Sequence, residues 1–221
     1  MSSDYRNTDY CCSLVELDLK KSLLNMEVFK AHPNQKIVYN KIRDKNGPFK
    51  AKFMHIYNYK CGYCGNSIDS INSTLFEIDH YICESSFESK ELAGEISNLV
   101  LSCYDCNRAK SSYFIKESYR TILNPDSQYI ASVFERDEMF YIKVSEKYQG
   151  DADVVQFYDK LKLGFQSRRL DFLLMNIAGL CKKIDGHPGA DSLNVVFRKL
   201  QLKRNLTSCK EFDPDYALAE A

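Results

Sequence analysis

In the first part of the chain, apolar residues recur at helical rather than strand spacing. Phe49, Phe53 and Ile56 stand four and three positions apart, which predicts a helix over about residues 48–57. A shorter helix is expected at residues 34–42, where apolar and basic positions also follow a helical period. The apolar residues that precede these two helices alternate only in part, so their pattern leaves strand and helix open.

The middle of the chain has the pattern of two short strands followed by a helix. Residues 75–80 and residues 99–101 are short, mainly apolar runs that predict strands. The residues between them, 81–97, are rich in serine and glutamate and predict a loop. A helix is expected to begin near residue 103 and to continue to about residue 115.

The last hundred residues are predicted to be mainly helical, with one short hairpin. These elements together indicate an α+β fold in three regions: an N-terminal helical extension with a basic segment (residues 1–60), a small core (61–120) and a mainly helical C-terminal region (121–221). The elements expected in the C-terminal region are a hairpin of residues 129–134 and 139–144, a helix capped by Asp153 and running to about residue 161, and helices over about 167–183 and 191–204.

Composition is ordinary for a water-soluble globular protein and excludes a membrane class. Of the 221 residues, 44% are hydrophobic and 27% are charged, which allows one sizeable core. No apolar run approaches the roughly 18 residues that a spanning helix needs. The first residues have no apolar signal core behind them, so we expect a cytoplasmic protein without a membrane segment.

The formal net charge of zero hides a strong segregation of charge along the chain. Residues 30–60 contain eight basic residues and one acidic residue, and residues 161–210 contain ten basic and three acidic residues. Residues 61–99, which lie between them, contain seven acidic residues and one basic residue. Two basic segments around an acidic one suit a metal site that lies between two surfaces in contact with phosphate. The alternative is that these charged residues lie on solvated helix faces, which would give the same numbers of basic and acidic residues.

Four of the nine cysteines form two CxxC pairs with 38 residues between them, Cys61/Cys64 and Cys103/Cys106. In a reducing compartment such pairs favour metal binding over disulfides, and four sulfurs complete a closed tetrahedral zinc site, which is structural. Iron in place of zinc, or a redox pair with coincidental thiols, remains the alternative. The other cysteines, which have no ligand spacing and are expected to be small core residues or free thiols, are Cys11, Cys12, Cys83, Cys181 and Cys209.

Between the cysteine pairs, or directly after them, stand residues that suit phosphodiester hydrolysis. Asp79 and His80 close the first predicted strand, Asn98 precedes the second, and Asn107 follows Cys106. A histidine with a pKa near 6.5 can take a proton from water at neutral pH. Carboxylate and amide oxygens are hard ligands that suit Mg²⁺ or Mn²⁺. The alternative interpretation is that Asp79 and His80 are an ordinary pair at a strand end, and that Asn98 and Asn107 are simple turn and cap residues.

Three strings, Glu77-Ile78-Asp79-His80, Asn98-Leu99-Val100 and Cys106-Asn107-Arg108-Ala109-Lys110, resemble the HNH endonuclease family. That family has the ββα-metal fold. Its four-cysteine branch, which includes restriction-type enzymes and phage resolving endonucleases, carries cysteine pairs at these places. The resemblance covers about residues 61–113 and implies a ββα-metal core with a structural Cys₄ zinc.

The resemblance implies a role for each of these residues. His80 would be the general base, while Asp79 and Asn107 would hold one catalytic Mg²⁺ or Mn²⁺. Asn98 would pin the loop and, through its backbone carbonyl, orient the imidazole. Two positions depart from the most common family pattern: Asn107 stands where histidine is frequent, and Cys83 stands where proline is common.

Nucleic-acid contacts are expected from basic residues near this site, namely Lys50, Lys52, Arg108 and Lys110. DNA is the expected substrate because most relatives cut DNA, although the residues leave DNA versus RNA open. The helical additions resemble HNH effectors of restriction or anti-phage loci, some of which act with an ATPase subunit as protein partner. The alternative is a zinc-stabilised nucleic-acid-binding module, or a partner subunit, without catalysis.

Overall fold

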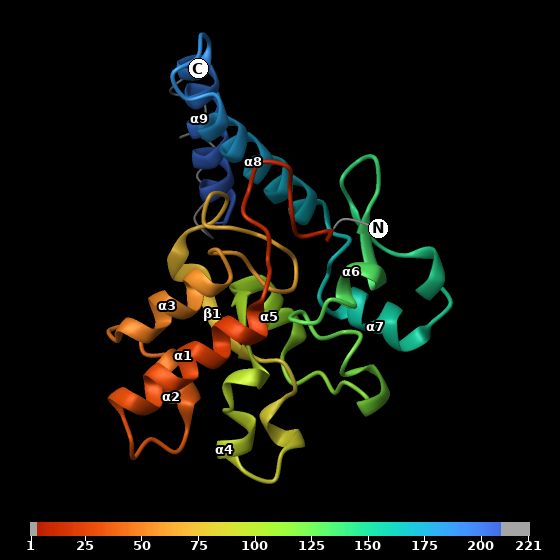
Figure 1. Cartoon of the computed structure of the whole chain (residues 1–221). Helices are drawn as coiled ribbons and strands as arrows, with labels where there is room; N and C mark the ends of the chain where they lie inside the picture. The colour runs from red at the N-terminus through yellow and green to blue at the C-terminus, as the bar shows by residue number, and fades with distance from the viewer. Residues whose placement is uncertain (1–3, 209–221) are drawn as a thin grey trace.

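The computed structural model describes residues 4–208 and has a two-stranded sheet at its centre (Figure 1). Strands β1 (Phe76–His80) and β2 (Leu99–Cys103) pair antiparallel, and helix α5 (Tyr104–Lys110) follows directly. This confirms the two strands and the helix start predicted from the sequence. Helix α5 is shorter than expected, because Ser111 adopts φ +50°, outside the helical region, and ends it.

Three helices precede the central sheet: α1 (Leu17–Ala31), α2 (Val38–Ile42) and α3 (Pro48–Ile56). Figure 1 shows them together on one side of β1, with α6 and α7 on the other side. Helix α3 confirms the prediction for residues 48–57, and α2 begins later than expected. The sequence could not assign α1 because the helix is apolar on two faces: Leu24 and Val28 are buried, whereas Leu19 and Met26 are exposed.

The C-terminal part is mainly helical, as predicted, but differs at two places. Residues 130–133 form a helical turn instead of strand, so the hairpin is shorter than expected. Helix α7 is capped by Asp151, whose carboxylate accepts the backbone N–H groups of Asp153 and Val154. The elements of this part are α6 (Ile130–Val133), β3 (Phe134–Arg136), β4 (Ile142–Val144), α7 (Ala152–Lys160), α8 (Gln166–Lys183) and α9 (Ala190–Ser208).

Short helical turns connect the longer elements, and several stand where a plain loop was expected. The segment between β1 and β2 contains α4 and two of these turns, which give the chain a defined path from His80 to Asn98. The turns are η1 (Ser73–Leu75), η2 (Glu84–Ser86), α4 (Lys90–Ala93), η3 (Ile96–Asn98), η4 (Glu117–Tyr119) and η5 (Glu146–Tyr148).

No helix in the described part of the chain is long and apolar enough to cross a membrane. Cys209 lies outside the described residues.

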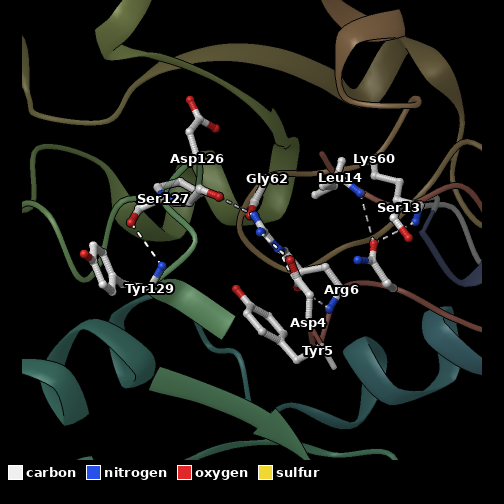
Figure 2. Close-up of polar contacts among 12 residues, drawn as sticks. Asp4, Tyr5, Arg6, Ser13, Leu14, Lys60, Gly62, Asp126, Ser127 and Tyr129 are labelled. Carbon is white, nitrogen blue, oxygen red and sulfur yellow. Dashed lines mark hydrogen bonds and ion pairs between the residues drawn. The ribbon is translucent and has the colours of Figure 1, made fainter. Parts of the chain in front are cut away.

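The N-terminal segment before α1 is tied to the first CxxC turn (Figure 2). The Arg6 guanidinium donates from Nη1 to the carbonyl oxygens of Gly62 and Pro125, both at 2.6 Å, and pairs with Asp4. A Cβ at Gly65, which has φ +77°, would stand 2.7 Å from the Arg6 Cα, so glycine is required there. The start of the chain therefore covers the CxxC turn and is part of the same packed structure.

A buried ion pair joins α1 to the segment that follows η4. Lys21 Nζ lies 2.6 Å from Asp126 Oδ2, and both side chains are 1% exposed. Lys21 also donates to the Ser97 carbonyl at 3.1 Å, and the Tyr57 hydroxyl donates to Asp126 Oδ1 at 2.7 Å. Because every charge in this cluster is paired, it can hold α1, α3 and the later segment together without an unsatisfied buried group.

We expect Lys21→Met to lower the free energy of unfolding by about 3–5 kcal/mol, because it leaves the Asp126 carboxylate buried without its cation. The matched control is Lys52→Met, since Lys52 pairs with Glu27 where both side chains are about half exposed, and its loss should cost at most about 1 kcal/mol. Urea unfolding followed by circular dichroism measures both. Similar losses for the two variants would contradict the importance of the buried pair.

A candidate metal centre and active site

The four cysteines of the two CxxC pairs meet in one buried cluster. The sulfur atoms of Cys61, Cys64, Cys103 and Cys106 all lie within 4.8 Å of one another, and the Sγ atoms of Cys64 and Cys103 are 3.8 Å apart. A tetrahedral zinc ion with Zn–S bonds of about 2.3 Å requires sulfur separations of about 3.8 Å. The donor set and its geometry therefore fit a closed zinc site.

Backbone contacts bring the two CxxC turns together. The Gly62 N–H donates to the Leu101 carbonyl at 2.7 Å, which joins the first turn to β2 just before Cys103. A Cβ at Gly62 would stand 2.7 Å from Val100 Cγ1, so only glycine allows this approach. Strand β2 ends at Cys103 and leads directly into α5, which contains Cys106. The bond from Gly62 to β2 therefore holds the first CxxC turn next to the second one.

Arg168, on α8, lies beside this cluster and was not predicted from the sequence. The residue is 4% exposed, and its Nη1 lies 3.6 Å from the Sγ of Cys103 and 3.7 Å from the Asp105 carboxylate. Burial opposes the charge on the guanidinium, but the four nearby sulfurs raise the pKa of Arg168 well above its usual value. A cation at this place offsets the negative charge that a four-thiolate zinc site carries.

Asp79, near the end of β1, is 7% exposed and is already paired. The Tyr63 hydroxyl donates to its Oδ2 at 2.6 Å, and Lys110 Nζ lies 3.2 Å from Oδ1 and 3.0 Å from Oδ2. Burial raises the pKa of Asp79, although Lys110 and Tyr63 act in the opposite direction. Lys110 is 1% exposed, so the ammonium expected to contact phosphate is instead turned inward onto Asp79.

Asn98 holds the loop that follows the first strand. Its side chain accepts the Ile82 N–H at 2.8 Å and donates to the carbonyl oxygens of Ile82 and Ala93 at 3.0 and 2.8 Å. Its backbone carbonyl accepts the Tyr81 N–H at 2.7 Å. These bonds fix the main chain directly after His80, which suits the loop-pinning role expected for Asn98. Within residues 4–204 no hydrogen bond joins the Asn98 carbonyl to the imidazole of His80, so the expected orienting contact is not formed.

His80 is half-buried at the end of β1 and packs against an aromatic ring from α2. Its ring centroid lies 4.3 Å from that of Tyr39, with the planes inclined at 46°. Burial lowers the pKa of His80 below its usual value, although the nearby Asp79 carboxylate acts in the opposite direction. The imidazole is therefore uncharged at neutral pH and has a lone pair available to accept a proton.

Asn107, in the first turns of α5, is held by Glu77 rather than by Asp79. Its Nδ2 donates to Glu77 Oε2 at 2.6 Å, and the Arg108 guanidinium lies 3.5 Å from Glu77 Oε1. Glu77 and Asp79 are two positions apart on β1, so both carboxylates lie on the face of the strand that meets α5. Within residues 4–204 no hydrogen bond joins the side chains of Asp79 and Asn107 directly.

A pocket of about 290 Å³ opens beside Glu77 and Asn107 and is lined by basic residues. Lys50 and Arg108, two of the expected nucleic-acid contacts, line it, whereas Lys52 pairs with Glu27 away from it. Burial lowers the pKa of Lys50, and the positive charge of the neighbouring Lys45 lowers it further. Two further lining cations, Arg43 and Lys45, were not named from the sequence, where the positive charge of residues 30–60 was the available signal.

The HNH endonuclease family model matches residues 61–112. The matched segment begins at the first CxxC pair and includes both strands, both pairs and α5. Members of this family are nucleases, so the match points to nuclease activity on nucleic acid, and the matched segment contains the four-cysteine cluster. No curated protein and no solved structure matches the chain.

Residues outside the HNH segment complete the surroundings of its candidate catalytic residues. Tyr39 and Arg43 come from α2 and its C-terminal end, and Lys50 comes from α3. Arg168 reaches the cysteine cluster from α8. The HNH segment is therefore surrounded by side chains from both of the flanking regions.

Total metal analysis of the purified protein should return about one zinc per chain, because the four sulfurs complete one closed tetrahedral site. A Cys61→Ser/Cys64→Ser variant should lose this zinc and unfold at a lower temperature, since metal binding and folding are coupled. The matched control, Cys181→Ala, removes a buried thiol that lies outside the cluster and should keep the metal. Stably folded wild-type protein without zinc would contradict the assignment.

Proposed function

We propose that this protein is a metal-dependent HNH endonuclease that hydrolyses phosphodiester bonds, with DNA as the favoured substrate. The observation that carries the proposal is the family match over residues 61–112, which contains Asp79, His80, Asn98 and Asn107 in the order expected for the family. The packing of β1, β2 and α5 supports a ββα-metal core, because the two strands and the helix meet around these residues.

In this proposal His80 is the general base that takes a proton from the attacking water. Burial lowers its pKa, so the imidazole is neutral at pH 7 and can accept that proton. Asn98 fixes the backbone after His80 through its bonds to Ile82 and Ala93. The base is thereby held at the end of a strand whose pairing partner is fully buried.

Asp79 and Asn107 are the proposed holders of one Mg²⁺ or Mn²⁺ ion. When bound, the cation would neutralise charge on the phosphate and on the leaving oxygen. The residues fit such an ion chemically, since two carboxylates on one face of β1 and an amide on α5 provide hard oxygen ligands. We assign Lys110 to the positioning of Asp79, because its ammonium is buried against that carboxylate and against the His80 carbonyl at 2.7 Å.

Substrate phosphates are proposed to bind in the basic pocket next to Asn107. Within the described residues, Arg43, Lys45 and Lys50 form no ion pair, so their charges are available to a polyanion. Arg108 lies at the same pocket, and its ion pair with Glu77 has a separation of 3.5 Å. The Glu77 carboxylate also lines this pocket, but its four cations outnumber that one anion, and an excess of positive charge is favourable where a nucleic-acid backbone supplies the anions.

A second candidate function is a zinc-stabilised nucleic-acid-binding module without catalysis. The pairing of Asp79 with Lys110 and Tyr63 favours it, because a carboxylate already neutralised by a buried ammonium attracts a cation less strongly. A further part of the proposal, a restriction or anti-phage effector that acts with an ATPase or another partner, rests on the family resemblance and the helical additions alone.

Purified wild-type protein should cut plasmid DNA in the presence of Mg²⁺ or Mn²⁺ and should not cut with a chelator. His80→Ala should reduce the rate by about 10²–10⁴-fold, because it removes the base. The matched control is His55→Ala, since His55 is an exposed histidine of α3 whose ring packs on Tyr59 instead. A short RNA assayed in parallel decides between DNA and RNA.

Two other outcomes of this assay would overturn the proposal. Cleavage that survives in His80→Ala would show that His80 is not the base or that a contaminant cuts. Wild-type protein that binds nucleic acid but cuts neither substrate, with any of the metals, would favour the binding module.

Binding of duplex DNA should weaken as salt is raised, and Arg43→Gln and Lys50→Gln should each reduce the slope of log K against log salt by about one. Lys52→Gln is the matched control, because Lys52 is a half-exposed lysine of the same helix that faces Glu27 rather than the pocket. Fluorescence anisotropy with a His80→Ala background, which prevents cleavage, measures all three. An equal effect of Lys52→Gln would contradict the pocket as the phosphate site.

A further inference from the structure

Helix α2, which lies outside the HNH segment, places Tyr39 against His80. The two ring centroids are 4.3 Å apart, and the Tyr39 side chain is half-buried. The Tyr39 N–H donates to the Gly94 carbonyl at 3.2 Å, and a Cβ at Gly94 would stand 2.8 Å from Ile37 Cγ2. Helix α2 therefore packs closely on the segment that connects β1 to β2, so the position of Tyr39 is defined by the fold.

The backbone around His80 is fixed, but the imidazole itself is not held by hydrogen bonds. Lys110 donates to the His80 carbonyl at 2.7 Å, and Tyr81 donates to the Asn98 carbonyl. Within residues 4–204, the imidazole nitrogens of His80 form no hydrogen bond, and its only ring contact is with Tyr39. Because rotation about the last side-chain bond of histidine is broad, the Tyr39 ring is a contact that can restrict the orientation of the imidazole.

We propose that Tyr39 is a positioning residue that holds the imidazole of His80 in the orientation needed to take a proton from water. This inference rests on the proposed function, in which His80 is the base. Proton transfer requires a hydrogen bond between the base and the water, so a rotated imidazole loses rate even though the base is still present. The ring of Tyr39, rather than its hydroxyl, carries this role.

Tyr39 also joins the base to the basic pocket. It lines the pocket together with Arg43, whose guanidinium carbon lies 5.2 Å from the centroid of the Tyr39 ring. Burial raises the pKa of the Tyr39 phenol, although Arg43 acts in the opposite direction, so the phenol is uncharged at neutral pH. The same short helix thus supports the base and presents a cation to the substrate.

Steady-state cleavage of DNA by Tyr39 variants tests the role. Tyr39→Leu should lower kcat by about 10–100-fold and change KM by a smaller factor, because the base is misplaced while Lys45, Lys50 and Arg108 still line the pocket. Tyr39→Phe keeps the ring and should stay close to wild type. The matched control is Tyr113→Leu, since Tyr113 is a half-buried tyrosine whose ring packs on Phe157 at 6.1 Å.

Two kinetic results would overturn the inference. An unchanged kcat in Tyr39→Leu would show that the imidazole needs no support from this ring. A loss in Tyr39→Phe as large as that in Tyr39→Leu would assign the effect to the hydroxyl instead.

Proton NMR tests the contact without any cleavage. The chain has four histidines, and the His80 ring signals are identified by their loss in His80→Ala. The Tyr39 ring should shift these signals, and Tyr39→Leu should return them toward the values of an exposed histidine. Signals that do not move overturn the contact, and signals that move while kcat does not overturn the positioning role. Wild-type protein that makes the contact but cuts nothing overturns the proposed function instead, and with it the catalytic role of both residues.

Discussion

The convergence of four buried sulfur atoms is the constraint on which the rest of this structure depends. The HNH segment contains two five-residue strands, the short helices α4 and α5 and three helical turns, and a two-stranded hairpin is marginally stable on its own. The first CxxC turn is bonded to Leu101 of β2, and the second turn leads into α5. A metal ion that joins the four sulfurs would therefore hold every element of the candidate active site in one arrangement.

Both ends of the described chain are anchored to this cysteine cluster or beside it. Arg6 bonds the Gly62 carbonyl from the N-terminal segment, and Arg168 approaches the Cys103 sulfur from α8. Asp171, one turn after Arg168, accepts from Asn66 in the first turn and pairs with Arg204 of α9. The flanking regions thus pack onto the HNH segment through buried, charge-assisted hydrogen bonds, which are stronger than neutral ones.

The balance of charge inside and around the site follows one physical rule, that buried charges are paired and unpaired charges remain where an anion can reach them. Lys21 and Lys110 are both 1% exposed, and each has a carboxylate partner. Arg43, Lys45 and Lys50 converge at the pocket without an ion pair among the described residues. The zero net charge of the chain therefore conceals a locally positive surface beside the candidate catalytic residues.

The sequence by itself determined the cysteine cluster, the two strands and the order of Asp79, His80 and Asn107, because these features depend on short spacings along the chain. Only the tertiary structure decided which lysine faces inward and which faces a pocket, since Lys50, Lys52 and Lys110 look alike in the sequence. Only the tertiary structure showed that Tyr39 and Arg168 belong to the site, because they reach it from helices that are distant in the sequence. Their positions depend on how α2 and α8 pack, and no local pattern records that packing.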